Sequence, residues 1–248
     1  MAPTVLQQRR RIGRPGEDNT RNDCQAEVTV HRPSIAMRAW RLPPGARAGK
    51  ITNRRQTGSP MSSLFVRNLA EHSDVLTTLA ALEDQVQAAA AMLSSSLRSG
   101  GKVLFCGNGG SAADSQHLAS ELTGRLVHDR RPLAAIALTT DTSALTCIAN
   151  DYSFEAVFAR QVLGLGRPGD CLVAISTSGQ SANVLAAVHA ARSIGVLTVG
   201  LLGHDGGQLR QSVDCAIVVA SSTTARIQEM HILIGHTLCG LVEESLGL

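Results

Sequence analysis

Residues 171–195, CLVAISTSGQSANVLAAVHAARSIG, decide the fold class of this chain. The stretch begins with a continuous apolar run, passes through a loop rich in Ser and Thr, and continues into an Ala- and Val-rich segment with helical spacing. A short apolar run without alternation is typical of a strand that is buried on both faces. The stretch therefore predicts a strand, a loop and a helix of an α/β protein.

The same pattern is repeated on both sides of this stretch. Four further apolar runs cover residues 102–107, 133–138, 196–202 and 215–220, and each is followed by a loop and an Ala- or Leu-rich segment. Strands joined by helical crossovers are parallel and form a sheet that helices cover on both faces. The sequence therefore predicts an α/β fold, with ligands beyond the carboxyl ends of the strands.

One long helix is predicted before the first strand. Apolar residues recur every three or four positions between Leu76 and Leu97, and Ser73 is a suitable N-cap. The pattern ends at the Ser-Gly-Gly of residues 99–101. We therefore expect the folded domain to begin near Met61 and to include residues 61–248.

The first 60 residues differ from the rest in composition. They hold eleven Arg, one Lys and four acids, a net charge of +8, whereas residues 61–248 hold eleven basic and sixteen acidic residues, a net charge of −5. Such a Pro-rich segment without apolar periodicity cannot offset its ordering entropy, so we expect residues 1–60 to be a disordered leader. The alternatives are a basic arm for nucleic acid or a membrane surface, and a start assigned upstream of the true one.

The composition of the chain excludes several classes of protein. Of its 248 residues, 17% are charged and 44% are apolar, and this apolar fraction is enough to build a hydrophobic core. No apolar stretch approaches the roughly 18 residues of a membrane-spanning helix, and the acidic domain gives no reason to expect nucleic-acid binding. The six cysteines lack metal-ligand spacing, so we expect free thiols in a reducing cytoplasm.

The loop after the first strand fits a dinucleotide fingerprint in form. Residues 107–112 read GNGGSA, which matches G-x-G-x-x-A. A nicotinamide site also needs an acid about 20 residues further on, at the end of the second strand. The first acid there is Asp141, which lies 29 residues beyond Ala112, so the sequence argues against a dinucleotide. The glycines still allow the backbone to approach another ligand closely.

A second loop, residues 176–181, reads STSGQS and leads directly into a helix. Its four hydroxyl groups, its glycine and the free N–H groups of the helix suit a phosphate monoester. The alternative is a Ser-rich N-cap, which needs only one hydroxyl. Because four hydroxyls exceed that need, we predict a phosphate site. The absence of a GKS or GKT sequence argues against nucleotide phosphoryl transfer.

Side chains that bind metals occur on two predicted helices. His117 and Glu121 are four residues apart and lie on one helix face beside the glycine-rich loop. Gln228 and His236 lie on the last helix about 12 Å apart along its axis, so they can meet one ion only by leaning toward it. Such a set suits zinc. The alternatives are that His117 and Glu121 form an ordinary surface pair, and that the His on the last helix is buried and bonds a backbone carbonyl.

Four long motifs carry a resemblance to a known family. They are CGNGGSAADSQHLASELTGR at 106–125, ALTTDTSALTCIANDYSFE at 137–155, GDCLVAISTSGQSANVLAA at 169–187 and RIQEMHILIGHTLCGLVEESL at 226–246. In this order they resemble the phosphoheptose isomerases, a branch of the sugar-isomerase (SIS) family, over about residues 62–247. The leader has no counterpart in that family.

The resemblance implies a fold, an activity and an assembly. The fold is a three-layer α-β-α sandwich with a five-stranded parallel sheet. The activity is the ketose–aldose isomerisation of sedoheptulose 7-phosphate to D-glycero-D-manno-heptose 7-phosphate, which supplies bacterial heptose biosynthesis and the lipopolysaccharide core. The implied enzyme is a cytoplasmic homotetramer with active sites between subunits and one zinc ion per subunit.

Carried over position by position, the resemblance also implies site residues. The metal ligands are His117, Glu121, Gln228 and His236, and among them Glu121 is the catalytic base and His236 the acid. The substrate contacts are Asn108, Gly109, Gly110, Glu121, Asn150, Asp151, Ser176, Thr177, Ser178, Ser181 and Gln228. The alternative is a non-catalytic SIS protein that binds the bacterial replication initiator. That relative lacks residues matching Glu121 and His236, so their presence here favours the enzyme.

Overall fold

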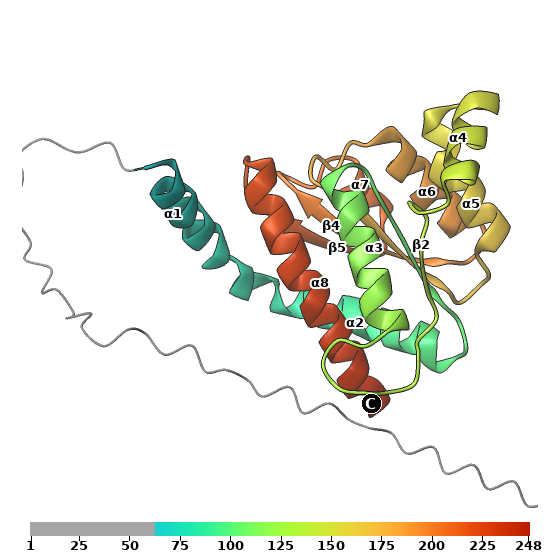
Figure 1. Ribbon diagram of the computed structural model, residues 1–248, viewed down its shortest axis with the longest axis horizontal. Coiled ribbons are helices and arrows are strands. Elements are labelled where there is room, and N and C mark those ends of the chain that lie inside the picture. The colour runs from blue at the N-terminus through green and yellow to red at the C-terminus, as the bar shows by residue number, and fades with distance from the viewer. Residues whose placement is uncertain (1–62) are drawn as a thin grey trace, which may run out of the picture. The chain divides into compact units, whose positions relative to one another are not determined.

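Five parallel strands form the centre of the structure, a computed structural model that describes residues 63–248 (Figure 1). They are β1 (Val103–Gly107), β2 (Ala135–Ala137), β3 (Cys171–Ser176), β4 (Leu197–Gly203) and β5 (Cys215–Val219). Their order across the sheet is β2-β1-β3-β4-β5, and every neighbouring pair is parallel. Each strand coincides with one of the five apolar runs, with β4 extending one residue beyond its run to Gly203, so the predicted α/β sheet is confirmed.

Helices cover both faces of this sheet. They are α1 (Leu64–Leu76), η1 (Leu79–Leu82), α2 (Glu83–Arg98), α3 (Gly110–Thr123), α4 (Thr142–Asp151), η2 (Phe154–Ala156), α5 (Val157–Leu165), α6 (Ala182–Ser193), α7 (Leu209–Ser212) and α8 (Thr224–Leu246). Alternate strand residues enter two separate cores. Val103 and Phe105 pack with α2, α3 and α8, whereas Leu104 and Cys106 pack with α5 and α6. The expected three-layer sandwich is therefore confirmed.

The single long helix predicted before β1 is wrong. Ser73 lies inside α1, whose N-cap is Ser63. The hydroxyls of Thr77 and Thr78 bond carbonyls of the last turn of α1 at 2.7 Å, and the chain passes through η1 before α2 begins at Glu83. β-Branched Thr side chains that bond the local backbone offer it an alternative to continuing the helix, which explains the break.

Helix α5 is a second difference, since the sequence pattern did not identify a helix between α4 and β3. Three of its nine residues, Val157, Phe158 and Val162, are buried against the core that α6 covers. The helix has only nine residues and begins directly after η2. So short an apolar pattern does not by itself distinguish a separate helix from its neighbours.

Three expectations concern the leader, membrane-spanning helices and the cysteines. The predicted leader, residues 1–60, lies outside the described residues and stays a prediction. Along residues 63–248, no helix combines the length and the apolar character that crossing a bilayer requires. The cysteines in the described part of the chain, Cys106, Cys147, Cys171, Cys215 and Cys239, are all free, as expected for them.

The order of the strands identifies where a ligand fits. From β1 the chain moves outward to β2 on one side, and the later strands continue from β3 on the other. Ligands of open α/β sheets bind at such a switch point, outside the carboxyl ends of the strands. Gly107 at the end of β1 is level with Ile175 in β3, so the glycine-rich loop and the STSGQS loop emerge side by side.

Candidate active site

Helices α3 and α8 lie side by side across one face of the sheet (Figure 1), and a glycine permits their close approach. Gly235 is buried in α8, and a Cβ atom built there would lie only 2.6 Å from the Leu118 side chain of α3. Any larger residue at this position would therefore displace the buried Leu118 side chain and disturb the packing of the two helices. The small residue brings the polar face of α3 within reach of His236, the residue that follows it.

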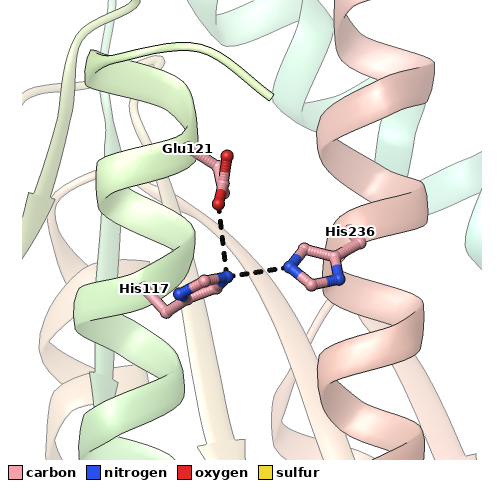
Figure 2. A group of neighbouring side chains, drawn as sticks. All are labelled: His117, Glu121 and His236. Atoms are coloured by element: carbon pink, nitrogen blue, oxygen red, sulfur yellow. Dashed lines mark hydrogen bonds and ion pairs between the residues drawn. The ribbon is translucent and has the colours of Figure 1, made fainter. Parts of the chain in front are cut away.

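Three polar side chains converge in the gap between these helices (Figure 2). The Nε2 atoms of His117 and His236 are 2.8 Å apart, and His117 Nε2 lies 3.2 Å from Glu121 Oε1. The three ligand atoms all lie within 4.8 Å of one another. Two imidazole nitrogens and a carboxylate oxygen are a donor set that zinc prefers, so the residues present fit this metal.

Arg130 joins the C-terminal end of α3 to α8. Its guanidinium donates to the carbonyls of Glu121 at 2.7 Å, Leu122 at 2.9 Å and Gly124 at 3.0 Å. Its Nε donates to the Glu243 carboxylate at 2.7 Å, and the Arg side chain is only 2% exposed. A cation stabilises the C-terminus of a helix. Here the same cation also fixes the backbone of Glu121, so it holds this turn of α3 against α8.

Gln228, the fourth predicted ligand, lies in the second turn of α8. Its side-chain amide contacts Gly110, the first residue of α3, so closely that a Cβ at that position would collide with it. Gln228 is thus two turns of α8 away from His236 and beside the glycine-rich loop. The structure therefore brings three of the four predicted ligands together around one point, and it places the fourth against the loop predicted to hold the sugar.

The STSGQS loop folds around the hydroxyl of Ser176. This oxygen lies 3.1 Å from Ser181 Oγ and 3.5 Å from Ser178 Oγ, and it accepts a bond from the Gly179 N–H at 3.1 Å. Ser181 is the N-cap residue of α6, but its side chain makes no capping bond. The alternative of a simple Ser cap therefore does not account for this hydroxyl. Three of the four predicted hydroxyls therefore gather at the carboxyl end of β3, and the half-buried Thr177 lies in the same loop.

The glycine-rich loop lies next to this hydroxyl cluster. Asn108 is half-buried, and Gly109 is the N-cap residue of α3 with a positive φ of 56°. A cavity of about 180 Å³ adjoins the loop and is lined by Gly107, Asn108, Gly109, Ala112, Thr139, Leu145, Phe154 and Phe158. The N–H groups of Ser111 and Ala112 bond the carbonyls of Asn108 and Gly109 at 3.0 Å, so the open space and the Asn108 side chain are what this loop offers a polar ligand.

Asn150 and Asp151 lie at the exposed C-terminal end of α4. The Asn150 amide donates to Asp151 at 2.8 Å, and the Cys147 thiol lies 3.3 Å from the same carboxylate. These bonds lower the pKa of Asp151, with the bond from Asn150 as the larger cause. Within residues 63–248, no hydrogen bond connects this pair to the STSGQS loop or to the three-residue cluster. The two residues stay predicted contacts, on the helix that also contributes Leu145 to the cavity beside the glycine-rich loop.

The structure also shows polar residues at the site that the sequence analysis did not name. Asp114 lies one turn before His117, and its Oδ2 is buried without a hydrogen-bond partner among the described residues. Burial raises the pKa of this carboxyl, and the charge of His117 opposes that rise. Its spacing to His117 and Glu121 is that of one helix face, a signal that the sequence contained. No comparable signal pointed to Arg130.

Known proteins are similar to this chain in sequence and in fold. The model of the SIS domain family matches residues 67–203, and the chain belongs to this family. Its relatives include the phosphoheptose isomerase of Rhodospirillum rubrum, 59% identical over 158 residues that make up 64% of this chain and 84% of that protein. Phosphoheptose isomerase 1 of Campylobacter jejuni is 51% identical over 185 residues, which are 75% of this chain and 100% of that protein.

Solved structures with a similar fold include two phosphoheptose isomerases. A phosphoheptose isomerase from Francisella tularensis aligns with a TM-score of 0.71 and 39% identity, over 74% of this chain and all of that one. The enzyme from Neisseria gonorrhoeae aligns with a TM-score of 0.65 and 47% identity, over 73% of this chain and 95% of that one. The resemblance to phosphoheptose isomerases is therefore confirmed. These isomerase names do not support the alternative of a non-catalytic protein that binds the replication initiator.

Proposed function

We propose that this protein is a phosphosugar isomerase that converts sedoheptulose 7-phosphate to D-glycero-D-manno-heptose 7-phosphate for bacterial heptose biosynthesis. The observation that carries the proposal is the meeting of Glu121 and His236 around His117, from two helices that are far apart in the sequence. A carboxylate and an imidazole at one point supply the base and the acid that a ketose–aldose isomerisation needs. Relatives that this chain covers in full bear the name of that enzyme.

The reaction moves one proton between neighbouring carbons. In the proposed mechanism, the Glu121 carboxylate removes a proton from C1 of the ketose while His236 donates a proton to the oxygen on C2. The product of this half-reaction is an enediol. Glu121 then returns its proton to C2, and His236 takes the proton from the oxygen on C1, which leaves the aldose. Both groups end in their starting protonation states, so one base and one acid complete the cycle.

A zinc ion, one per subunit, is the cofactor that we propose for this site. His117, Glu121 and His236 would hold it, and Gln228 is the fourth ligand that the family resemblance implies. When bound, zinc supplies a positive charge that polarises the substrate carbonyl. The bonds from Arg130 to the backbone of Glu121 keep this carboxylate within reach of the opposite helix.

The two loops at the sheet edge would hold the two ends of the substrate. We assign the phosphate to the hydroxyl cluster of Ser176, Thr177, Ser178 and Ser181, where hydroxyl and helix N–H donors face an anion. We assign the sugar to Asn108, Gly109, Gly110 and Gln228. The close contact of Gln228 with Gly110 and the bonds from Asn108 to α6 support this assignment. Asn150 and Asp151 stay predicted contacts, on an exposed helix end.

A homotetramer with active sites between subunits is the assembly that we propose. Helix α1 supports self-association because none of its residues is buried. Its exposed apolar side chains are Leu64, Phe65, Val66, Leu69 and Leu76. Several large exposed apolar side chains on one helix are typical of a surface that associates with a partner. We also propose a cytoplasmic location, which the free thiols support.

Turnover of sedoheptulose 7-phosphate by the purified full-length chain tests the proposal. The expected result is conversion to the aldose phosphate, loss of conversion after chelation, and recovery when zinc is added back. A parallel reaction with the dephosphorylated heptulose tests the phosphate site, and it should show a much higher KM. Absence of turnover in zinc-replete protein would contradict the proposed function, even if the protein binds the substrate.

A further inference from the structure

We propose that Asn183, a residue outside the predicted site, is a positioning residue that aligns the sugar-binding loop through Asn108. The inference rests on the proposed function and deepens it, because it concerns how the sugar end of the same site is held. Asn183 lies in the first turn of α6, directly after the STSGQS loop, and it is only 3% exposed. Neither its position in the motif nor its spacing marked it in the sequence.

The carboxamides of Asn183 and Asn108 pair reciprocally. Asn108 Nδ2 donates to Asn183 Oδ1 at 2.8 Å, and Asn183 Nδ2 donates to Asn108 Oδ1 at 2.8 Å. A carboxamide has two N–H donors and two acceptor sites. Each side chain therefore uses one donor and one acceptor in the pair. Asn108 keeps one donor and one acceptor site for a ligand.

Burial makes this pair costly to break. Because Asn183 is almost fully buried, loss of its partner would leave a polar amide without a replacement from water. The pair also joins the two sides of the switch point, since Asn108 follows β1 and Asn183 follows β3 and its loop. The distance between the phosphate cluster and the sugar loop is therefore fixed by side chains as well as by the sheet.

Two roles for Asn183 predict different results. If it acts through Asn108, its loss disturbs only the sugar end, and inorganic phosphate, which needs only the hydroxyl cluster, binds as before. If it merely supports the start of α6, affinity for the phosphosugar and for inorganic phosphate must fall together. The ratio of the two effects separates positioning of the sugar loop from general support of the fold.

The test uses the full-length, zinc-loaded protein and two variants. Asn183→Leu keeps the approximate size of the side chain but removes its donor and its acceptor without placing a charge beside the phosphate loop, and Asn183→Ala removes the whole amide. We expect KM for sedoheptulose 7-phosphate to rise about three- to tenfold in each, as for loss of a hydrogen bond. The inhibition constant of inorganic phosphate should stay unchanged. An unchanged KM in both variants, or a parallel rise in both constants, would overturn the proposal.

A double-mutant cycle and a matched control complete the experiment. If Asn183 acts through Asn108, Asn108→Ala with Asn183→Ala should raise KM no more than Asn108→Ala alone, and additive effects would contradict the proposal. Thr198→Val is the control. Thr198 is buried near the amino end of β4, away from the carboxyl ends of the strands, and its hydroxyl donates to Asp214 at 2.7 Å. It should lower Tm without changing either constant.

Calorimetric titration with the same two ligands keeps the inference separate from the proposed function. A wild-type protein that binds sedoheptulose 7-phosphate without converting it would refute the isomerase while leaving the ratio of affinities to test Asn183. A wild-type protein that converts the substrate, with variants that bind both ligands normally, would refute only the inference. Failure of the wild-type protein to bind either ligand would overturn both.

Discussion

The two ends of the proposed site are built in different ways. The catalytic end places His117, Glu121 and His236 on two helices, which meet closely because Gly235 has no side chain. The phosphate end consists of one short loop whose hydroxyls gather around Ser176. The helical end depends on contacts between distant segments, whereas the loop end is contained in six consecutive residues. We therefore expect packing changes to affect the helical end far more than the loop end.

Removing the base or the acid should give the largest effect. Glu121→Gln keeps the size of the side chain but removes its basicity, so kcat should fall by about 10² to 10⁴ while the fold persists. His236→Gln should behave alike. If the two groups act as one unit, the double variant should be little worse than either single one. Steady-state kinetics with sedoheptulose 7-phosphate measures this.

The metal content of the same variants distinguishes two causes of inactivity. Both substitutions also change predicted zinc ligands, and a carboxylate that binds a cation is a weaker base. A variant that retains zinc and its oligomeric state yet loses turnover supports direct proton transfer. Recovery of wild-type turnover with excess zinc would refute it. Near-normal kcat in Glu121→Gln without added metal would contradict the assignment of the site.

A larger residue at Gly235 should impair the catalytic end of the site and leave the phosphate end unaffected. Gly235→Ala adds a methyl group against Leu118, although Ala itself favours a helix by about 1 kcal/mol over Gly. Overpacking of this kind typically costs about 1 to 3 kcal/mol, and a shift of about 1 Å in a catalytic group costs about 10²-fold in rate. We expect kcat to fall accordingly, while the inhibition constant of inorganic phosphate stays unchanged.

Gly240→Ala, on the same helix, is the matched control for Gly235→Ala. The nearest atom to a Cβ at Gly240 is Leu126 Cδ2 at 3.7 Å, an ordinary contact. This variant should retain kcat and gain a little stability, which thermal unfolding would detect. Equal losses of kcat in both glycine variants would show that helix propensity or solubility, rather than the approach of α3 to α8, determines the rate.

Changes in the loop should affect binding and leave the rate constant alone. Ser181→Ala removes a hydroxyl that lies 3.1 Å from Ser176 Oγ and is not used for capping. A bond from a neutral donor to a charged phosphate contributes about 1.5 kcal/mol or more, so KM should rise about tenfold with little change in kcat. Substitution of both Ser176 and Ser181 by Ala should raise it further. An unchanged KM in this double variant would move the anion site elsewhere.

Deletion of residues 1–60 should have the smallest effect. We propose that this basic segment is a leader that takes no part in either end of the site, because its net charge of +8 and its lack of apolar periodicity distinguish it from the domain. The truncated chain should retain kcat, KM and Tm. Size-exclusion chromatography provides the control, and loss of the oligomer or of stability on truncation would refute the proposal.

The sequence by itself determined the features that depend on neighbouring residues. The five apolar runs predicted the strands of a parallel sheet, and the STSGQS loop was identifiable because its four hydroxyls fall within six residues. His117 and Glu121 were predicted to share a helix face because helical spacing is local. The break between α1 and α2 was missed, since two Thr hydroxyls that bond the preceding turn outweigh a continuous apolar pattern.

Only the tertiary structure decided which distant residues meet. The sequence placed His236 on the last helix but did not give its distance from His117, which depends on Gly235 receiving Leu118. Nor did it show that the Arg130 guanidinium holds the backbone of Glu121. Such contacts depend on the packing of two helices more than 100 residues apart in the chain. Local propensity and periodicity carry no information about that packing, because its energy arises only when the whole core is assembled.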